Sequence, residues 1–341
     1  GVAAREAADP GRAFWAALAE RAGEVLPSMD TQDLALLLSA LARARHADEQ
    51  LVADAHRCAL LRLRYFSAQH LTMLLAALAK LEYREEEVSQ LTPEFRSRIP
   101  ELRGASALAM AVAALGRLRA SDRGLIKELG AQIESRLSAD DFHIRNIASV
   151  SAAYLRLQYL DAVHVDRLIG HAHATLHEAT PRELANVVLA ASSARAPGAD
   201  PLTSAAARLA EEKIPFMLPA EIVSMTFAFG QASHAGCGGR AAASMLVKLI
   251  GHAAEDAPCL EAWQVGSIIH SCARWRLPVP PPDLARLASA LGSRSGGLEP
   301  DLACKALCSL VSLLRPGARL HPDGDAAPGA GAAVAGEPAP A

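Results

Sequence analysis

Aromatic side chains are scarce in this 341-residue sequence, at 4% of the residues, although 51% of the residues are hydrophobic. Alanine and leucine supply most of the remainder, and small or straight-chain residues of this kind favour closely packed helices. Strand-forming residues are sparse and scattered, so a β-sheet protein is not expected. The composition therefore predicts an all-α fold.

Long hydrophobic runs and an excess of positive charge are both missing. Arg, Lys, His or Glu interrupts every apolar run before it reaches the length of a membrane span. The formal net charge is −3, so any basic surface that binds nucleic acid must be local. We therefore expect a soluble protein without a membrane partner.

The sequence also lacks the motifs of common enzyme and cofactor sites, namely GxGxxG, the Walker loop, HExxH and GxSxG. His173 and His177 lie one turn apart on one predicted helix, a spacing that could hold a metal ion, but no Cys or acidic partner stands at a suitable spacing. A solvated helix face is the favoured interpretation. We expect no enzyme activity, no cofactor, no metal site and no small-molecule substrate.

Six cysteines are present, and no two of them form a CxxC pair. Most lie in apolar helical stretches, which predicts buried, reduced thiols. Cys304 and Cys308, one turn apart, are expected to be core residues rather than a redox or metal pair. The cysteines are Cys58, Cys237, Cys259, Cys272, Cys304 and Cys308.

One short segment recurs eight times, at spacings of 37, 37, 39, 37, 38, 43 and 37 residues. We call the predicted helices that carry it B helices and number their positions from the first residue of each copy. The seventh position is small in every copy, and the second is nearly always small, so neighbouring helices can approach closely. A near-constant period in this range is typical of a solenoid. The first residues are Leu34, Leu71, Leu108, Ile147, Leu184, Ile222, Val265 and Leu302.

More amphipathic segments, which we call A helices, alternate with the B helices. One A helix and one B helix make a repeat of roughly 37 residues. The sequence thus predicts an α-solenoid of about eight two-helix repeats over residues 12–315, after an N-terminal extension (1–11) and before a Pro/Ala/Gly-rich disordered tail (316–341). The A helices are predicted at 13–25, 49–63, 86–99, 123–137, 162–176, 202–214, 241–254 and 282–291.

Local signals mark the joints between these helices. Thr180 and Glu183 form a predicted capping box with Pro181 at the first helical position. Thr31 and Ser67 stand at equivalent places and are expected to cap their B helices in the same way. The glycine-rich residues 235–239 predict a flexible loop.

Cations recur at the tenth position of five B helices, and a second column lies two residues further on. In stacked repeats, equivalent positions form a line, and a line of cations could follow a phosphate backbone. The same cations occupy the last helical turn, where they complement the macrodipole and free carbonyls, and both roles can hold together. The first column is Arg43, Lys80, Arg117, Arg156 and Arg274, and the second is Arg45, Arg119, Arg195 and Arg276.

The three tryptophans are dispersed along the sequence and are expected to be packing residues. Trp275 stands between Arg274 and Arg276, and this setting leaves a base-stacking role as the alternative.

The B-helix pattern, preceded by Ser, Thr or Pro, resembles that of the octotricopeptide and heptatricopeptide repeat proteins, which are relatives of the FAST-kinase-like and RAP-domain proteins. Residues 71–81 (LTMLLAALAKL) and 181–191 (PRELANVVLAA) carry the resemblance most clearly, and it extends over residues 12–315. We find no RAP domain. The resemblance implies work on organellar RNA, in transcript stabilisation or processing or as a bound component of a mitochondrial ribosome.

Two hypotheses follow. The first is an RNA-binding repeat protein of mitochondrial or, alternatively, plastid gene expression. It would bind single-stranded or ribosomal RNA along a groove, with the cation column on phosphates, beside other proteins of a ribonucleoprotein particle. The second is a non-catalytic scaffold subunit that uses the same groove for a peptide or a subunit. The repeat pattern favours the first hypothesis, and the near-neutral charge favours the second.

Overall fold

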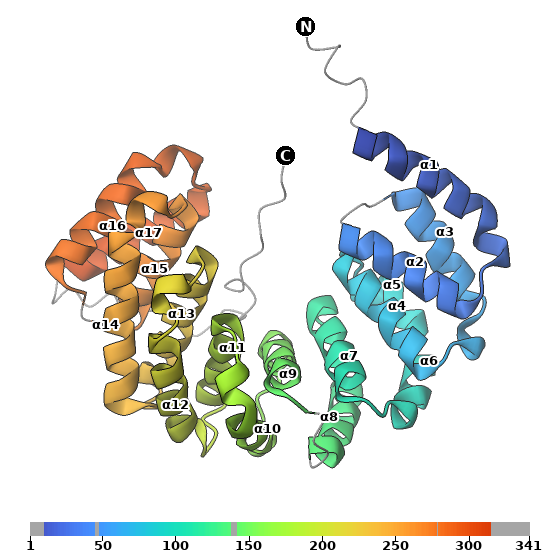
Figure 1. The fold of residues 1–341 in the computed structure, drawn as a ribbon, viewed down its shortest axis with the longest axis horizontal. Helices are drawn as coiled ribbons and strands as arrows, with labels where there is room; N and C mark the ends of the chain where they lie inside the picture. The colour runs from blue at the N-terminus through green and yellow to red at the C-terminus, as the bar shows by residue number, and fades with distance from the viewer. Residues whose placement is uncertain (1–9, 45–47, 138–141, 278, 315–341) are drawn as a thin grey trace, which may run out of the picture. The chain divides into compact units, whose positions relative to one another are not determined.

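The computed structural model describes residues 10–44, 48–137, 142–277 and 279–314. Their regular structure consists of α-helices and short 3-10 turns, with no strand in these ranges (Figure 1). The predicted all-α solenoid fold is confirmed. The tail at 316–341 and most of the extension at 1–11 lie outside the described residues. The chain forms two compact units, residues 1–141 and 142–341.

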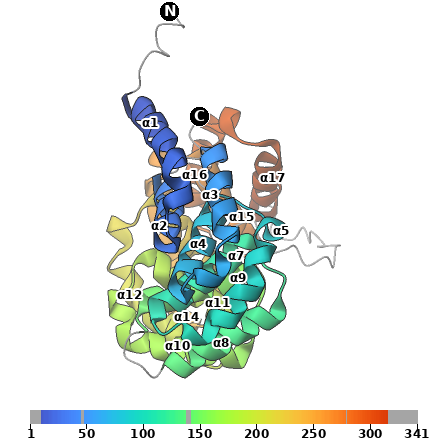
Figure 2. The same cartoon turned by 90° about the vertical axis from the view of Figure 1, so that its right-hand side faces the viewer.

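Unit 1 holds three B helices, and each packs against the next one along the chain. Figures 1 and 2 show α2, α4 and α7 following one another through this unit. The A helices form a second layer against them. The B helices are α2 (Thr31–Ala44), α4 (Ala68–Lys80) and α7 (Ala105–Leu118), and the A layer contains α1 (Pro10–Val25), α3 (Glu49–Leu60), α5 (Glu85–Val88), α6 (Thr92–Arg98) and α8 (Arg123–Leu137).

Unit 2 repeats this two-layer arrangement. Its B helices again contact their successors, and its A helices pack on one another in the second layer (Figure 1). The B helices are α9 (Ile144–Leu157), α11 (Pro181–Ser193), α13 (Pro219–His234), α15 (Ala262–Arg274) and α17 (Pro300–Leu314). The A helices are α10 (Ala162–Thr175), α12 (Ala199–Glu211), α14 (Gly239–Glu255) and α16 (Pro281–Ser293).

The A helix predicted at 86–99 is broken in the structure. It forms α5, a 3-10 turn at Ser89–Leu91, and then α6. Pro93 explains the break because proline has no N–H to donate to the Ser89 carbonyl, and its ring would clash with that carbonyl in a continuous helix. The second helix starts at Thr92, which places Pro93 in its first turn, where proline is tolerated.

The small seventh position of the B helices is buried wherever a B helix has neighbours on both sides within its unit. Ala77, Ala190 and Ala228 are each at most 2% exposed. The equivalent residues of α2 and α17, Ala40 and Cys308, are exposed. Close helix approach through this column is therefore a property of the interior of the stack.

Most cysteines are not buried, contrary to the prediction. Cys272 on α15 is buried, whereas Cys304 and Cys308 on α17 are exposed. Among the described residues of α17 only Ala306 and Ser309 are buried. The prediction was wrong because it treated α17 as an interior B helix, although no described repeat follows it.

The helix caps agree with the sequence at two of three positions. Thr180 accepts from the Glu183 backbone N–H at 3.3 Å, and Ser67 accepts from that of His70 at 3.2 Å. Thr31 does not cap α2. Asp30 does so instead, with its carboxylate accepting from the Asp33 N–H at 2.8 Å, because the helix starts one residue earlier than a cap at Thr31 implies.

Cations at or just beyond the ends of A helices join consecutive repeats. Each donates to backbone carbonyls in the joint of the preceding repeat. The Arg62 guanidinium, for example, donates to the Pro27 carbonyl at 2.7 Å. Such bonds satisfy carbonyls that the helix ends leave without a partner. These cations are structural, and their recurrence at 36, 115 and 81 residues, close to one, three and two repeats, was overlooked in the sequence. They are Arg62, Arg98, Lys213 and Arg294.

Candidate nucleic-acid interface

The interior B helices present one narrow stripe of side chains to solvent. In α4, α7, α11, α13 and α15, the third, sixth and tenth positions are partly or fully exposed. These positions fall on one face because the third and tenth are seven residues apart, close to two helical turns, and the sixth lies a little under one turn from the third. In α7 the stripe is Met110, Ala113 and Arg117. The first cation column therefore belongs to the solvent-facing stripe.

Unit 1 brings three members of that column together. Arg43, Lys80 and Arg117 end the consecutive, mutually packed helices α2, α4 and α7, and all three are exposed. Partial burial lowers the pKa of Lys80, and the positive charges of Arg117 and Arg43 lower it further. Lys80 is therefore repelled by the arginines on both neighbouring B helices. We call Arg43, Lys80 and Arg117 the basic row.

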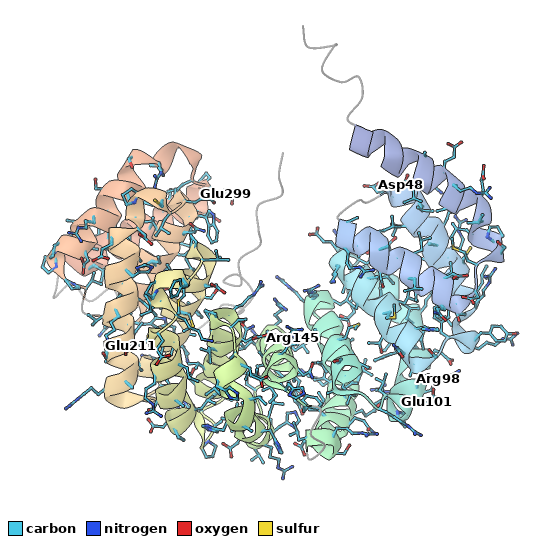
Figure 3. All side chains as sticks on the ribbon, in the orientation of Figure 1. Asp48, Arg98, Glu101, Arg145, Glu211 and Glu299 are labelled. Atoms are coloured by element: carbon cyan, nitrogen blue, oxygen red, sulfur yellow. The ribbon has the colours of Figure 1, made fainter. Side chains whose placement is uncertain are left out.

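Two members of the basic row lack an acidic partner. Within the described residues, neither Arg43 nor Lys80 lies within 4.0 Å of a carboxylate oxygen, whereas several A-layer arginines, such as Arg57 and Arg96, are paired with acids. Arg98 and Glu101, labelled in Figure 3, are 3.5 Å apart near the end of α6. Arg43 donates to the carbonyl of Ser39 at 3.3 Å, so it also satisfies a backbone carbonyl near the end of its own helix.

The cation column is interrupted in unit 2. Arg156 on α9 is half-buried and Arg274 on α15 is exposed. Between them, α11 and α13 carry Ser193 and Gln231 at the same position. The structure therefore does not join Arg156 and Arg274 into one row.

Arg274 instead lies near other basic groups. Burial lowers the pKa of His270, and the charges of Arg274 and of Lys305 on α17 lower it further. The His270 ring Nδ1 is 3.2 Å from the Ser309 hydroxyl. A second basic cluster therefore occupies the α15–α17 face.

The second cation column has a backbone role that the sequence did not reveal. Arg45 lies outside the described residues. Arg119, Arg195 and Arg276 are exposed and adopt left-handed backbone conformations, with φ between 50° and 53°. They occupy the residue just past the helix end, where glycine is preferred. In each case the backbone N–H of the next residue donates to a carbonyl in the last turn of the helix. Ala120, for example, donates to the Leu115 carbonyl at 3.0 Å.

Replacing Arg119 with glycine should raise the stability of the protein and weaken its binding to RNA. Glycine removes the left-handed penalty, worth about 1 kcal/mol in the free energy of unfolding. If Arg119 contacts a phosphate, its loss lowers affinity about fivefold at 0.1 M salt. Thermal melting and RNA titration of the same variant measure both effects.

Glu82 provides the matched control, since it takes the same left-handed conformation after α4 with φ of 62°. Glu82→Gly should give a similar gain in stability without a loss of affinity. Equal RNA affinity for wild type and Arg119→Gly would contradict a phosphate contact at this position.

An aromatic cluster lies on the same stripe in unit 2. Trp275, directly after α15, reaches back to α13, where its ring centroid is 6.0 Å from that of Phe227 and 5.1 Å from that of His234. The Arg274 guanidinium lies 4.8 Å from the indole centroid. A Cβ on residue 230 would lie 2.3 Å from the indole ring, so the absence of a side chain at Gly230 leaves room for Trp275.

Phe227 and His234 were not singled out from the sequence. A usable signal was present, because Phe227 holds the sixth position of α13 and His234 lies two turns further along the same face.

Other kinds of site find little support. The described residues contain no group of three or more His, Cys, Asp or Glu side chains placed to bind a metal ion. A concavity of about 790 Å³ lies between α14 and α16, on the A layer. Arg294 lines it, but its guanidinium already donates hydrogen bonds to backbone carbonyls. No helix in the described ranges combines the length and apolarity that a membrane span requires.

The fold and its exposed cations define an α-helical repeat protein with a locally basic B-helix face. The family model for the RNA-editing substrate-binding complex 6 protein matches residues 3–179, just over half of the chain, and the chain belongs to this family. It is therefore an RNA-associated helical protein. The match does not extend to the octotricopeptide and heptatricopeptide assignment, which remains a resemblance. No curated protein matches the chain.

Proposed function

We propose that this protein is a non-catalytic RNA-binding subunit of an organellar RNA-processing complex, and that it binds single-stranded RNA through the B-helix face. The basic row of unit 1 carries the proposal. Partial burial lowers the pKa of Lys80, and repulsion from the positive charges of Arg117 and Arg43 lowers it further. Such repulsion costs stability, and a bound polyanion would convert it into attraction.

The contrast with the structural cations supports this assignment. Arg62 and Arg294 are hydrogen-bonded to backbone carbonyls, and several A-layer arginines, such as Arg96, are paired with acids. Arg43 and Lys80 have no carboxylate near them in the described ranges. Exposed cations held in line and left without counter-charges are suited to a phosphate backbone.

Family membership supports the finer points of the proposal. The family name refers to a substrate-binding complex of RNA editing, so we propose RNA and other proteins of a ribonucleoprotein particle as partners. RNA-editing complexes of this kind are mitochondrial, which favours the mitochondrion over the plastid. A role on ribosomal RNA is an alternative within the same proposal.

Binding of a fluorescent single-stranded RNA, measured against salt, tests the proposal. Each phosphate contact contributes about 0.7 to the slope of log K against log salt, so the basic row alone predicts a slope of about −2. A salt-independent affinity, or no binding at 50 mM salt, would contradict the proposal.

A scaffold role is the second candidate, and the exposed face of α17 favours it. Leu307, Val311 and Leu314 are 61%, 50% and 66% exposed. Apolar side chains in this number on one helix suit contact with a further protein. Stable binding to a protein of the complex, with no affinity for RNA, would select this alternative.

A further inference from the structure

We propose that Phe227, Trp275 and His234 form a stacking platform for a base of single-stranded RNA, with Arg274 beside it to contact the adjoining phosphate. This platform deepens the function proposed above and rests on it. It is separate from the basic row, since all four residues belong to unit 2. Its ligand is an unpaired nucleotide, because only an unstacked base offers a free ring face.

The position of Trp275 on the molecule supports the proposal. It holds the eleventh position of its B helix, where α4, α7 and α9 carry Leu81, Leu118 and Leu157. The leucines of α7 and α9 are buried, each 6% exposed, whereas Trp275 is half-buried. The indole therefore spreads over the solvent-facing stripe of α13, and part of its surface remains accessible.

The indole N–H gives a second argument. Trp275 Nε1 is buried and has no hydrogen-bond partner in the structure. An unsatisfied buried donor destabilises the protein, and leucine at this position would fill space without that cost. Packing alone therefore does not account for tryptophan here. A wide aromatic surface on the RNA-binding face does.

The surrounding side chains match the chemistry of a nucleotide. Phe227 and His234 lie next to the indole with their ring planes inclined to it by 66° and 40°, so together they line an aromatic site, and His234 is exposed. The Arg274 guanidinium lies over the Trp275 ring and 5.9 Å from the Phe227 centroid. Within the described residues it has no carboxylate within 4.0 Å, so its charge is available to a phosphate beside a stacked base.

The experiment compares two oligomers of equal length, a single-stranded oligouridylate and an abasic ribose-phosphate chain. Both offer the same phosphates, but only the first offers bases. Wild type should bind the oligouridylate about tenfold more tightly, as expected for one stacked base. Trp275→Leu should lose this preference and retain its affinity for the abasic chain.

Trp263→Leu is the control, since Trp263 lies at the other end of α15, and it should keep the tenfold preference. His234→Ala changes an exposed side chain, so we expect unchanged thermal melting together with a lower preference for the oligouridylate. Equal binding of both oligomers by wild type, or a preference that survives both platform substitutions, would overturn the platform and leave the proposed function standing. Failure of wild type to bind either oligomer would overturn the proposed function and the platform with it.

Discussion

Replacing Ala114 or Ala153 with leucine lowers the free energy of unfolding by about 1–3 kcal/mol, as expected for extra methylene groups in a packed helix interface. Both residues hold the seventh position of a B helix and are at most 2% exposed. A leucine there has to displace the neighbouring helix or adopt a strained rotamer. Chemical denaturation of the purified variants measures the loss.

Ala40→Leu provides the control for these two variants. It makes the same substitution at the same position of α2, where the alanine is exposed. Its stability should change by less than about 0.5 kcal/mol. Three variants of equal stability would show that the seventh position does not mark the helix interface.

The repeat was predictable from the sequence because the physical constraint recurs. Each interior B helix is enclosed by neighbours, so small and apolar residues return at fixed positions, and the eight copies reinforce a pattern that is weak in any one of them. Most helix bounds agree with the prediction within a few residues, as in α8, where both ends agree.

The ends of the stack were less predictable. Cys304 and Cys308 fit the repeat pattern but are exposed, because burial depends on a neighbour that α17 lacks in the described structure. The sequence pattern identifies α17 as a B helix, but the burial of its side chains depends on which helices pack against it. The two-unit division falls within the 39-residue spacing between Leu108 and Ile147, but the longer 43-residue spacing lies inside unit 2, so spacing alone did not predict it.

The candidate site was predictable in part. The first cation column was visible from position alone, and its interruption by Ser193 and Gln231 can also be read in the sequence. The sequence could not show that Arg43 and Lys80 lack an acidic partner, because ion pairs depend on which side chains meet in the fold. The left-handed geometry of Arg119 was hidden because its position usually carries glycine. The aromatic platform was hidden because Trp275 crosses to the preceding repeat.

Changing Arg43, Lys80 and Arg117 together to glutamine should weaken binding to single-stranded RNA about a hundredfold at 0.1 M salt. Three lost phosphate contacts remove about 2.1 from the salt slope, and this slope corresponds to a hundredfold at that concentration. Glutamine preserves helix propensity, and removing the mutual repulsion offsets the loss of helix-end interactions, so the melting temperature should stay within a few degrees.

The control removes the same charge elsewhere in unit 1. Arg57 lies on an A helix, and Arg64 and Arg103 precede the N-terminal ends of α4 and α7. The Arg57→Gln, Arg64→Gln and Arg103→Gln triple variant should retain most of its affinity, because phosphate contacts act locally and distant charges are screened at 0.1 M salt. Similar losses in both triple variants would indicate a general charge effect instead of a row.

If the basic row only complements helix ends, its triple variant should lose up to about 1 kcal/mol of stability per site and bind RNA as wild type does. Denaturation and RNA titration of the two triple variants, done in parallel, separate these outcomes.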